Sequence, residues 1–193
     1  MMEFALDRLG IVLIPGNPPR FEAQASFKSR NSGNTKVTGV ETSVAGQGQL
    51  GKGTLFLLAG YTFMQPLFKD SLRYGSSTNE NTLKYRFRHL AKADVEYNIG
   101  GFAAGAALNY FSFMQAIDAI FESDFVEPFK GVNRFRRQHN NGSYIVDVRT
   151  SYKMTKSLKI SLLCNNLFNE VYTMRPALLE APRSFCLRLD YKI

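Results

Sequence analysis

The sequence has no tryptophan and, among its 193 residues, only two cysteines, Cys164 and Cys186. The two lack the close spacing of a metal-ligand pair, so we interpret them as inert thiols rather than as a disulfide or a metal site. No run of about 18 apolar residues is present, which excludes a transmembrane helix. The longest apolar-leaning stretch, Gly100 to Phe113, is interrupted by Asn109 and Ser112. If the chain spans a bilayer, it must do so with strands.

Motifs that carry chemistry are also missing. There is no glycine-serine nucleophile elbow, no clustered His/Cys ligand set and no glycine-rich phosphate loop. Glu122, Asp124 and Glu127 share one loop, but carboxylates within one loop are a weak basis for acid–base catalysis. His89 and His139 are the only histidines, and capture of haem or a metal by one of them is an open alternative. We therefore predict no enzyme, no catalytic residue, no cofactor and no metal.

What the sequence does have is alternation of apolar and polar residues with a period of two, which is typical of strands. At the C-terminus an apolar set alternates with Cys186, Arg188, Asp190 and Lys192, and a helix would scatter these charges around its axis. The same pattern predicts strands at about 1–4 (incomplete), 24–47, 53–65, 83–98, 101–117, 142–154, 157–168 and 183–193, with an irregularity at His89. The apolar set at the C-terminus is Phe185, Leu187, Leu189, Tyr191 and Ile193.

The predicted connections alternate in length. Residues 50–53, 98–101 and 155–157 are tight turns rich in glycine and polar residues, whereas about 66–82, 118–142 and 169–182 are long polar loops. Segregated loop lengths are typical of outer-membrane barrels, whose long loops lie outside the cell. We predict an all-β fold: an antiparallel up-and-down transmembrane β-barrel segment of about eight strands, with short periplasmic turns and long extracellular loops. A soluble sandwich with solvated polar faces is the alternative.

Several segments resemble the C-terminal barrel of TonB-dependent outer-membrane receptors. Lys36-Val-Thr-Gly-Val-Glu41 resembles a strand that opens the last part of that barrel, and Asn165-Asn-Leu-Phe-Asn169 begins a pattern that resembles its closing part. The resemblance extends over nearly the whole chain, so residues 1–193 form one predicted domain. The positions that carry it are Gly39, Glu41, Asn165, Asn166, Leu167, Phe168, Asn169, Tyr172, Arg175, Pro176, Pro182, Arg183 and Phe185.

The resemblance implies a receptor for uptake of a scarce large nutrient, such as an iron chelate, in a barrel of about 22 strands with an internal plug. Nothing here resembles the plug or the segment that engages TonB, and the N-terminus lacks a signal-peptide pattern. Contacts with TonB and the plug are therefore expected only through a missing N-terminal part. The alternating C-terminal strand resembles the signal that the barrel-assembly machinery reads, with Ile193 in place of the usual phenylalanine.

The net charge of +8 favours an anionic partner. The segment from Phe129 to His139 combines cations with aromatic residues, as nucleic-acid binders do, but the aromatics of this chain belong largely to lipid-facing positions. We expect outer-membrane lipids and lipopolysaccharide as partners, and no nucleic acid. The candidate outer-rim lipid or ligand contacts are Arg86, Arg88, Arg134, Arg136 and Arg137.

A second hypothesis is a self-contained small outer-membrane barrel with a structural or adhesion role. Eight strands enclose only enough room for side chains, and nine or more inward charges would need extensive pairing there. We therefore predict an open, curved sheet, or a strained barrel at best, and a well-formed closed barrel of eight strands with its first and last strands hydrogen-bonded would contradict that prediction. A third hypothesis, a soluble basic β-protein that binds nucleic acid, predicts detergent-free solubility and salt-sensitive binding.

Overall fold

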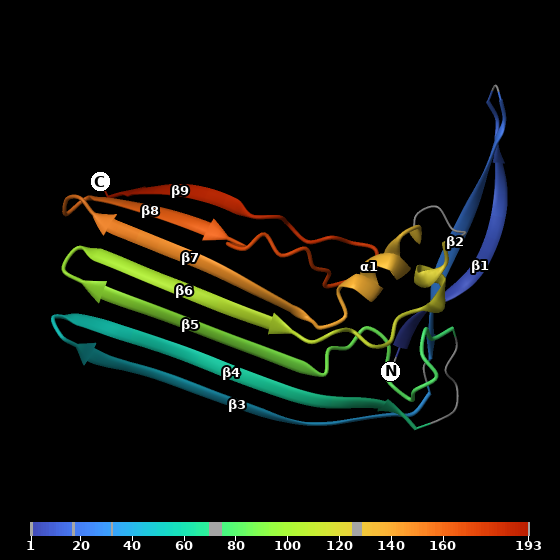
Figure 1. The fold of residues 1–193 in the computed structure, drawn as a ribbon, viewed down its shortest axis with the longest axis horizontal. Coiled ribbons are helices and arrows are strands. Elements are labelled where there is room, and N and C mark those ends of the chain that lie inside the picture. Colours follow the sequence, from blue (N-terminus) through green and yellow to red (C-terminus); the bar gives the residue numbers. More distant parts are fainter. Residues whose placement is uncertain (1, 17, 32, 70–74, 125–128, 193) are drawn as a thin grey trace.

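The computed structural model describes residues 2–16, 18–31, 33–69, 75–124 and 129–192 (Figure 1). Its main element is a seven-stranded antiparallel sheet in which strands adjacent in sequence are neighbours in space, in the order β3-β4-β5-β6-β7-β8-β9. β1 and β2 form a separate two-stranded sheet. The strands are β1 (Met2–Ile14), β2 (Arg20–Asn31), β3 (Thr35–Leu50), β4 (Gly53–Phe68), β5 (His89–Ile99), β6 (Phe102–Phe111), β7 (Ser143–Lys153), β8 (Leu158–Asn165) and β9 (Ser184–Tyr191); the helices are η1 (Ala119–Glu122) and α1 (Val132–Gln138).

The two ends of the sheet differ as the loop lengths predicted. At one end, called the turn end, the strands are joined by Gly51-Lys52, by Gly100-Gly101 and by residues 154–157 (Figure 1). Gly51 and Gly100 have φ values of 60° and 57°, a left-handed conformation that glycine adopts without steric cost. At the opposite end, called the loop end, lie the long connections 69–88, 112–142 and 166–183. The predicted up-and-down barrel segment is confirmed.

Several strand boundaries differ from the prediction. The predicted segment 24–47 is in fact two strands, β2 and β3, and the first strand continues to Ile14 rather than ending near residue 4. The strand predicted from residue 83 begins only at His89, where the alternation changes phase, because Tyr85 has a φ of 62° that interrupts an extended chain. Likewise β6 ends at Phe111, and residues 112–117 belong to the loop end. At residues 83–88 and 112–117, hydrogen bonds between the two connections, such as Tyr85 N–H to Ala116 O, replace the pairing of strands.

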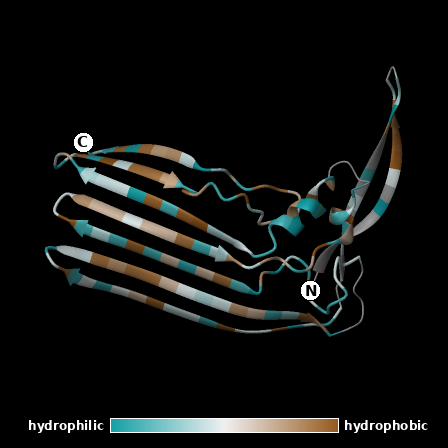
Figure 2. Cartoon of the chain, in the orientation of Figure 1, coloured by the Kyte–Doolittle hydropathy of each residue, from teal (hydrophilic) through white to brown (hydrophobic). Residues whose placement is uncertain are grey.

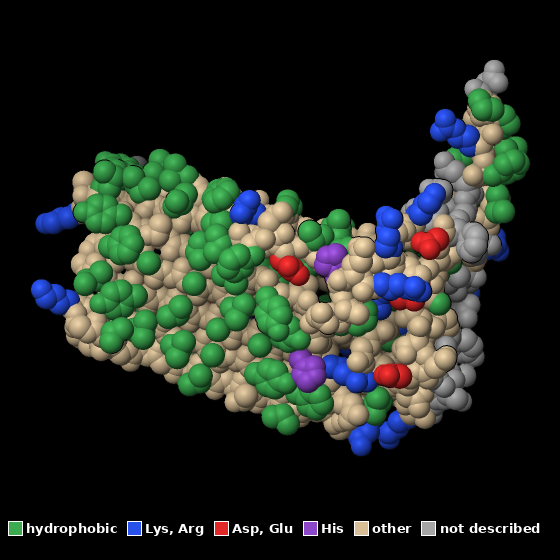
Figure 3. Space-filling view, viewed as in Figure 1, with side chains coloured by type: hydrophobic (Ala, Val, Ile, Leu, Met, Phe, Trp, Pro, Cys, Tyr) green, Lys and Arg blue, Asp and Glu red, His purple; other side chains and the backbone are tan. Residues whose placement is uncertain are grey.

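The strand register collects the alternating residues into two faces. On one face Val95, Ala106 and Val148 are register partners across β5, β6 and β7. On the other face the next row consists of Asp94, Ala107 and Asp147. The first face continues through β8 and β9 to Phe185, Leu187, Leu189 and Tyr191. Figure 2 shows the alternation of hydropathy along the strands, and Figure 3 shows apolar side chains spread over the sheet.

The sheet is open. Within the described residues β3 is hydrogen-bonded only to β4, and β9 only to β8, so the predicted absence of a closed barrel is confirmed. The buried apolar residues lie mainly at the loop end, as in Phe68, Leu83, Met114, Ala116 and Ile117. No helix among the described residues is long and apolar enough to span a membrane.

Candidate functional site

The polar face carries a charge network that crosses three strands. Arg149 on β7 donates two hydrogen bonds to the Asp94 carboxylate, of 2.8 Å from Nη1 and 2.7 Å from Nη2. Its Nε donates a third, of 3.0 Å, to Glu96 Oε2. A guanidinium that binds one carboxylate with two donors has its direction fixed as well as its charge balanced. This face therefore presents an ordered polar wall.

A glycine makes room for that network. Gly105 lies between Glu96 and Arg149 in the register. A Cβ atom at this position would lie 2.9 Å from Arg149 Cζ, so the guanidinium passes directly over the glycine backbone. Gly60 has the same relation to its register partner Lys92, whose Cε would lie 3.1 Å from an added Cβ. Long cations thus lie flat on the polar face instead of projecting from it.

An open cavity of about 210 Å³ lies on this face toward the turn end. Glu96, Arg149, Lys159, Arg188 and Asp190 are among its lining residues. Arg188 donates a 2.8 Å hydrogen bond from Nε to Asp190 Oδ1 on its own strand. The sequence predicted that Glu96, Arg149, Arg188 and Asp190 share an inward polar face, but their pairing depends on the register and could not be read from alternation.

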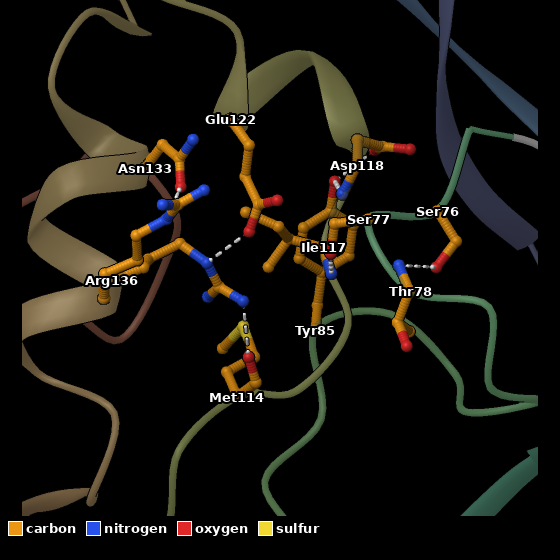
Figure 4. Close-up of polar contacts among 11 residues, drawn as sticks. Ser76, Ser77, Thr78, Tyr85, Met114, Ile117, Asp118, Glu122, Asn133 and Arg136 are labelled. Atoms are coloured by element: carbon orange, nitrogen blue, oxygen red, sulfur yellow. Dashed lines mark hydrogen bonds and ion pairs between the residues drawn. The ribbon is translucent and has the colours of Figure 1, made fainter.

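A second charged cluster lies at the loop end, where the connections pack on one another; Figure 4 shows Tyr85, Ile117 and Asp118 of this cluster. Lys84 forms an ion pair with Asp118 in which the two side chains are only 1% and 3% exposed. The hydroxyl of Tyr85 donates to the second carboxylate oxygen of Asp118. Ile117, which is fully buried, precedes the carboxylate, and its backbone N–H donates a 3.1 Å hydrogen bond to Ser77 Oγ. The two connections 69–88 and 112–142 are thereby joined around a buried charge.

Burial has a consequence for Tyr85. Burial away from water raises the pKa of the Tyr85 phenol well above its ordinary value of 10.0, and the hydrogen bond to the Asp118 carboxylate is the second cause. The phenol therefore stays neutral and acts as a donor. Sequence reasoning missed this cluster, since Lys84 and Tyr85 fit the alternation of a strand and nothing marked Asp118 as their partner.

The closing segment, 165–185, is held together by two asparagine side chains. Asn166 is 3% exposed. Its amide donates to the carbonyl of Glu170 at 2.9 Å and to that of Ala181 at 3.3 Å, and its Oδ1 accepts from the Glu170 N–H at 2.8 Å. Asn169 Oδ1 accepts from the backbone N–H of Arg183 at 2.9 Å. The two side chains therefore tie the end of β8 to the start of β9.

Backbone geometry explains why asparagine occurs at these two positions. Asn166 and Asn169 have φ values of 51° and 55°, and asparagine enters this region more readily than most other residues. The backbone N–H of Leu167 donates a 2.7 Å hydrogen bond to Val146 O on β7. The remaining motif positions in the connection are Phe168, which is exposed, Tyr172, Arg175, Pro176 and Pro182. The motif thus has a structural explanation, namely a fixed turn.

The other motif positions lie on strands. Gly39 on β3 faces β4 so closely that an added Cβ would lie 2.2 Å from Phe63 O, so only glycine fits. Glu41 shares its strand face and borders an open cavity of about 340 Å³ on the polar side. Phe185, Leu187, Leu189 and Tyr191 are exposed on the apolar face of β9. Ile193 and the loop residue Glu127 lie outside the described residues.

The five candidate arginines have different surroundings. Arg136 is held by Glu122 at 2.8 Å and by Met114 O at 3.0 Å, with its guanidinium 4.6 Å from the centre of the Phe113 ring. Arg88 contacts Thr82 at 3.0 Å and Glu80 at 3.4 Å. The remaining three are Arg86, which donates to its neighbour's carbonyl, Arg137, which donates to Asn133, and Arg134.

The histidines and cysteines show ordinary structural contacts. His89 Nδ1 lies 2.7 Å from the Tyr61 hydroxyl, and His139 stacks on Phe135 with ring centres 4.2 Å apart. Both cysteines are free. Among the described residues no group of three or more His, Cys, Asp or Glu side chains is arranged to hold a metal ion.

Comparison with known proteins identifies the barrel. The model of the family "TonB dependent receptor-like, beta-barrel" matches residues 10–167. Among solved structures, the chain is similar to the copper transporter OprC, with a TM-score of 0.50 and 13% sequence identity over 98% of this chain. The chain spans only 28% of the length of that transporter. No curated protein matches the sequence.

Proposed function

The chain belongs to the TonB-dependent receptor-like β-barrel family, and we propose that it forms the C-terminal part of a receptor barrel that takes up a scarce large nutrient, such as an iron chelate. The family consists of non-enzymatic transporters of the outer membrane. The observation that carries the proposal is the division of one continuous sheet into an apolar face and a charged, self-paired face. Such a sheet suits a wall between lipid and a polar interior.

The polar face supports this role physically. Charged groups can face a barrel interior only where they stay hydrated or where polar protein groups take the place of water. Arg149, Asp94 and Glu96 neutralise part of their charge within the wall, which leaves a surface that a hydrated ligand or a polar plug can pass or contact. Uptake itself would also need a plug domain and contact with TonB. The fold alone does not choose the ligand.

Uptake by the complete receptor tests the proposal. The experiment deletes, in the source cell, the whole reading frame that encodes this chain. The same reading frame is then restored. We expect deletion to slow growth on at least one iron chelate of a panel. Restoring the reading frame in cells with an intact TonB system should return growth on that chelate to normal. Normal growth and uptake of every tested chelate, cobalamin and oligosaccharide after deletion would contradict the proposal.

A matched pair of variants connects uptake to this chain. Arg149→Ala removes the charge network from the polar face, whereas Arg188→Ala removes a largely exposed arginine whose carboxylate partner lies on the same strand. We expect the first variant to change uptake more than the second at equal receptor abundance. Equal uptake for both variants and the parent would show that the network has no part in transport.

A further inference from the structure

The loop end contains an open, mainly apolar cavity of about 240 Å³ between α1 and the closing segment. α1 contributes Val132 and Phe135 to its wall, and the closing segment contributes Pro176, Leu178 and Leu179. An engineered protein cavity of about 150 Å³ lined by leucine, isoleucine and phenylalanine binds benzene. The cavity at the loop end therefore has room for a ring that carries a small substituent.

One wall of the cavity is built on a strained turn. Residues 175–178 form a tight turn in which the backbone N–H of Leu178 donates a 3.3 Å hydrogen bond to Arg175 O. Ala177 has a φ of 59°, where a residue with a Cβ atom is disfavoured and glycine is the usual choice. Strained residues persist only where the surrounding structure holds them, and they cluster at active and ligand-binding sites. The turn places Leu178 and Leu179, both exposed, along the cavity.

The charged side chains at the cavity are all of one sign. Lys130 and Arg136 line it, and the described lining residues include no aspartate or glutamate. Arg136 is held from two sides, by Glu122 Oε1 at 2.8 Å and by Met114 O at 3.0 Å (Figure 4). A guanidinium has more N–H donors than these two contacts use. Arg136 therefore has a fixed direction and keeps donors for a further acceptor.

These features together indicate the chemistry of a ligand. An apolar group in the cavity would cover the exposed leucines and remove apolar surface of both partners from water. A carboxylate on that group matches the planar donor geometry of Arg136 better than a neutral acceptor does. A ring is favoured over a flexible chain, because a rigid group loses less conformational freedom when it is bound.

We propose that the cavity between α1 and the closing segment binds the aromatic carboxylate arm of a larger ligand. The cavity is open, so the rest of that ligand can extend into water. The inference deepens the proposed function by naming the part of the nutrient that the loop end recognises, and it rests on that function for this role. Binding is measured on the purified protein without uptake, so a failure of binding and a failure of uptake can be recognised separately.

Fluorinated probes test the proposal on the full chain in detergent micelles. The dissociation constant of para-(trifluoromethyl)benzoate is measured by fluorine NMR, with protein-free micelles as the blank and para-(trifluoromethyl)benzyl alcohol as the uncharged probe. Val132→Phe fills the cavity from α1, whereas Gln138→Phe adds the same ring at an exposed position of α1 outside the cavity. Hydrogen exchange of the connection 112–142 shows whether each variant keeps its fold.

We expect the parent protein to bind the benzoate about tenfold more tightly than the alcohol, since only the benzoate offers a charged acceptor to Arg136. Val132→Phe should weaken benzoate binding by about tenfold, because the probe and the new ring cannot share the cavity. Gln138→Phe should leave it nearly unchanged.

A parent protein that binds both probes equally, or neither, would overturn the proposal, and this comparison needs no variant to fold. Equal affinities of the two folded variants for the benzoate would also overturn it, because the probe would then bind elsewhere.

Discussion

The loop end and the strands of this molecule bury their apolar residues in opposite directions. At the loop end Ala116 and Ile117 are fully buried around the Lys84–Asp118 pair. In the strands, Phe185, Leu187 and Leu189 point outward and are more than 60% exposed. The difference follows from the surrounding solvent: the connections pack on one another to exclude water, while the strands of a barrel place apolar side chains against lipid. The chain thus removes apolar side chains from water in two ways, by packing connections together at the loop end and by presenting one face of the sheet to lipid.

The largest expected effect concerns the buried charge at the loop end. Asp118→Leu would leave the Lys84 ammonium buried without its carboxylate, and breaking one half of a buried pair costs about 3–5 kcal/mol. We expect the connections 75–88 and 112–122 to lose protection from hydrogen exchange while the strands keep theirs. Hydrogen exchange of the protein in detergent micelles, resolved by peptide, measures this.

The control for that variant is the double substitution Lys84→Met with Asp118→Leu, which removes both charges and should recover most of the lost protection. If Asp118→Leu alone leaves exchange in the loop end unchanged, the pair does not hold the connections together. The contrast between a loop end with a buried core and a sheet with exposed apolar side chains would then lose its main support.

Two neighbouring alanines test the division of faces in the sheet. Ala106 lies between Val95 and Val148 on the apolar face, and Ala107 lies between Asp94 and Asp147 on the polar face. Arginine on a lipid face costs about 2–4 kcal/mol near the bilayer midplane, so Ala106→Arg should lower the free energy of unfolding in vesicles by that amount. Ala107→Arg gains two nearby carboxylates and should change it little. Reversible urea unfolding measures both, and equal losses would mean that the faces are not distinguished by lipid.

A smaller effect is expected where the sheet meets the loop end. Asn166→Ala removes hydrogen bonds to Glu170 and Ala181 from a buried side chain, at a cost of about 2 kcal/mol. Asn165→Ala removes only one exposed contact of 3.3 Å to Ser184 and serves as the control. We expect faster proteolysis of the connection 166–183 in the first variant only. Similar cleavage of both would show that the asparagine clamp is not what fixes this segment.

The smallest effect is a pH dependence confined to the loop end. Burial raises the pKa of Tyr85, and burial followed by the charge of Glu180 raises that of Tyr172. Unfolded tyrosine ionises near its ordinary value of 10.0, so the stabilisation is complete below pH 10 and is lost as pH rises through the higher folded values. Ultraviolet absorbance of tyrosinate should show late-ionising tyrosines that include Tyr85 and Tyr172, and Tyr85→Phe should remove one of them. Titration of every tyrosine near pH 10 would contradict this.

Much of the sheet could be predicted from alternation alone. The period of two assigned Leu187 and Arg188 to opposite faces, and the glycine-rich segments located the turns at 51–52 and 100–101, because strand geometry is local. Local patterns failed where distant segments pack. Lys84 continues the alternation of β5 and yet lies in a buried pair with Asp118, thirty-four residues away, so no short window of sequence contains the cause.

The sequence by itself determined which residues share the apolar face of the sheet, which share the polar face and where the tight turns lie, since each depends only on neighbours along the chain. Only the tertiary structure decided the ion pairs of Arg149 and Lys84 and the close approach at Gly39. Those features depend on strand register and on the packing of remote connections.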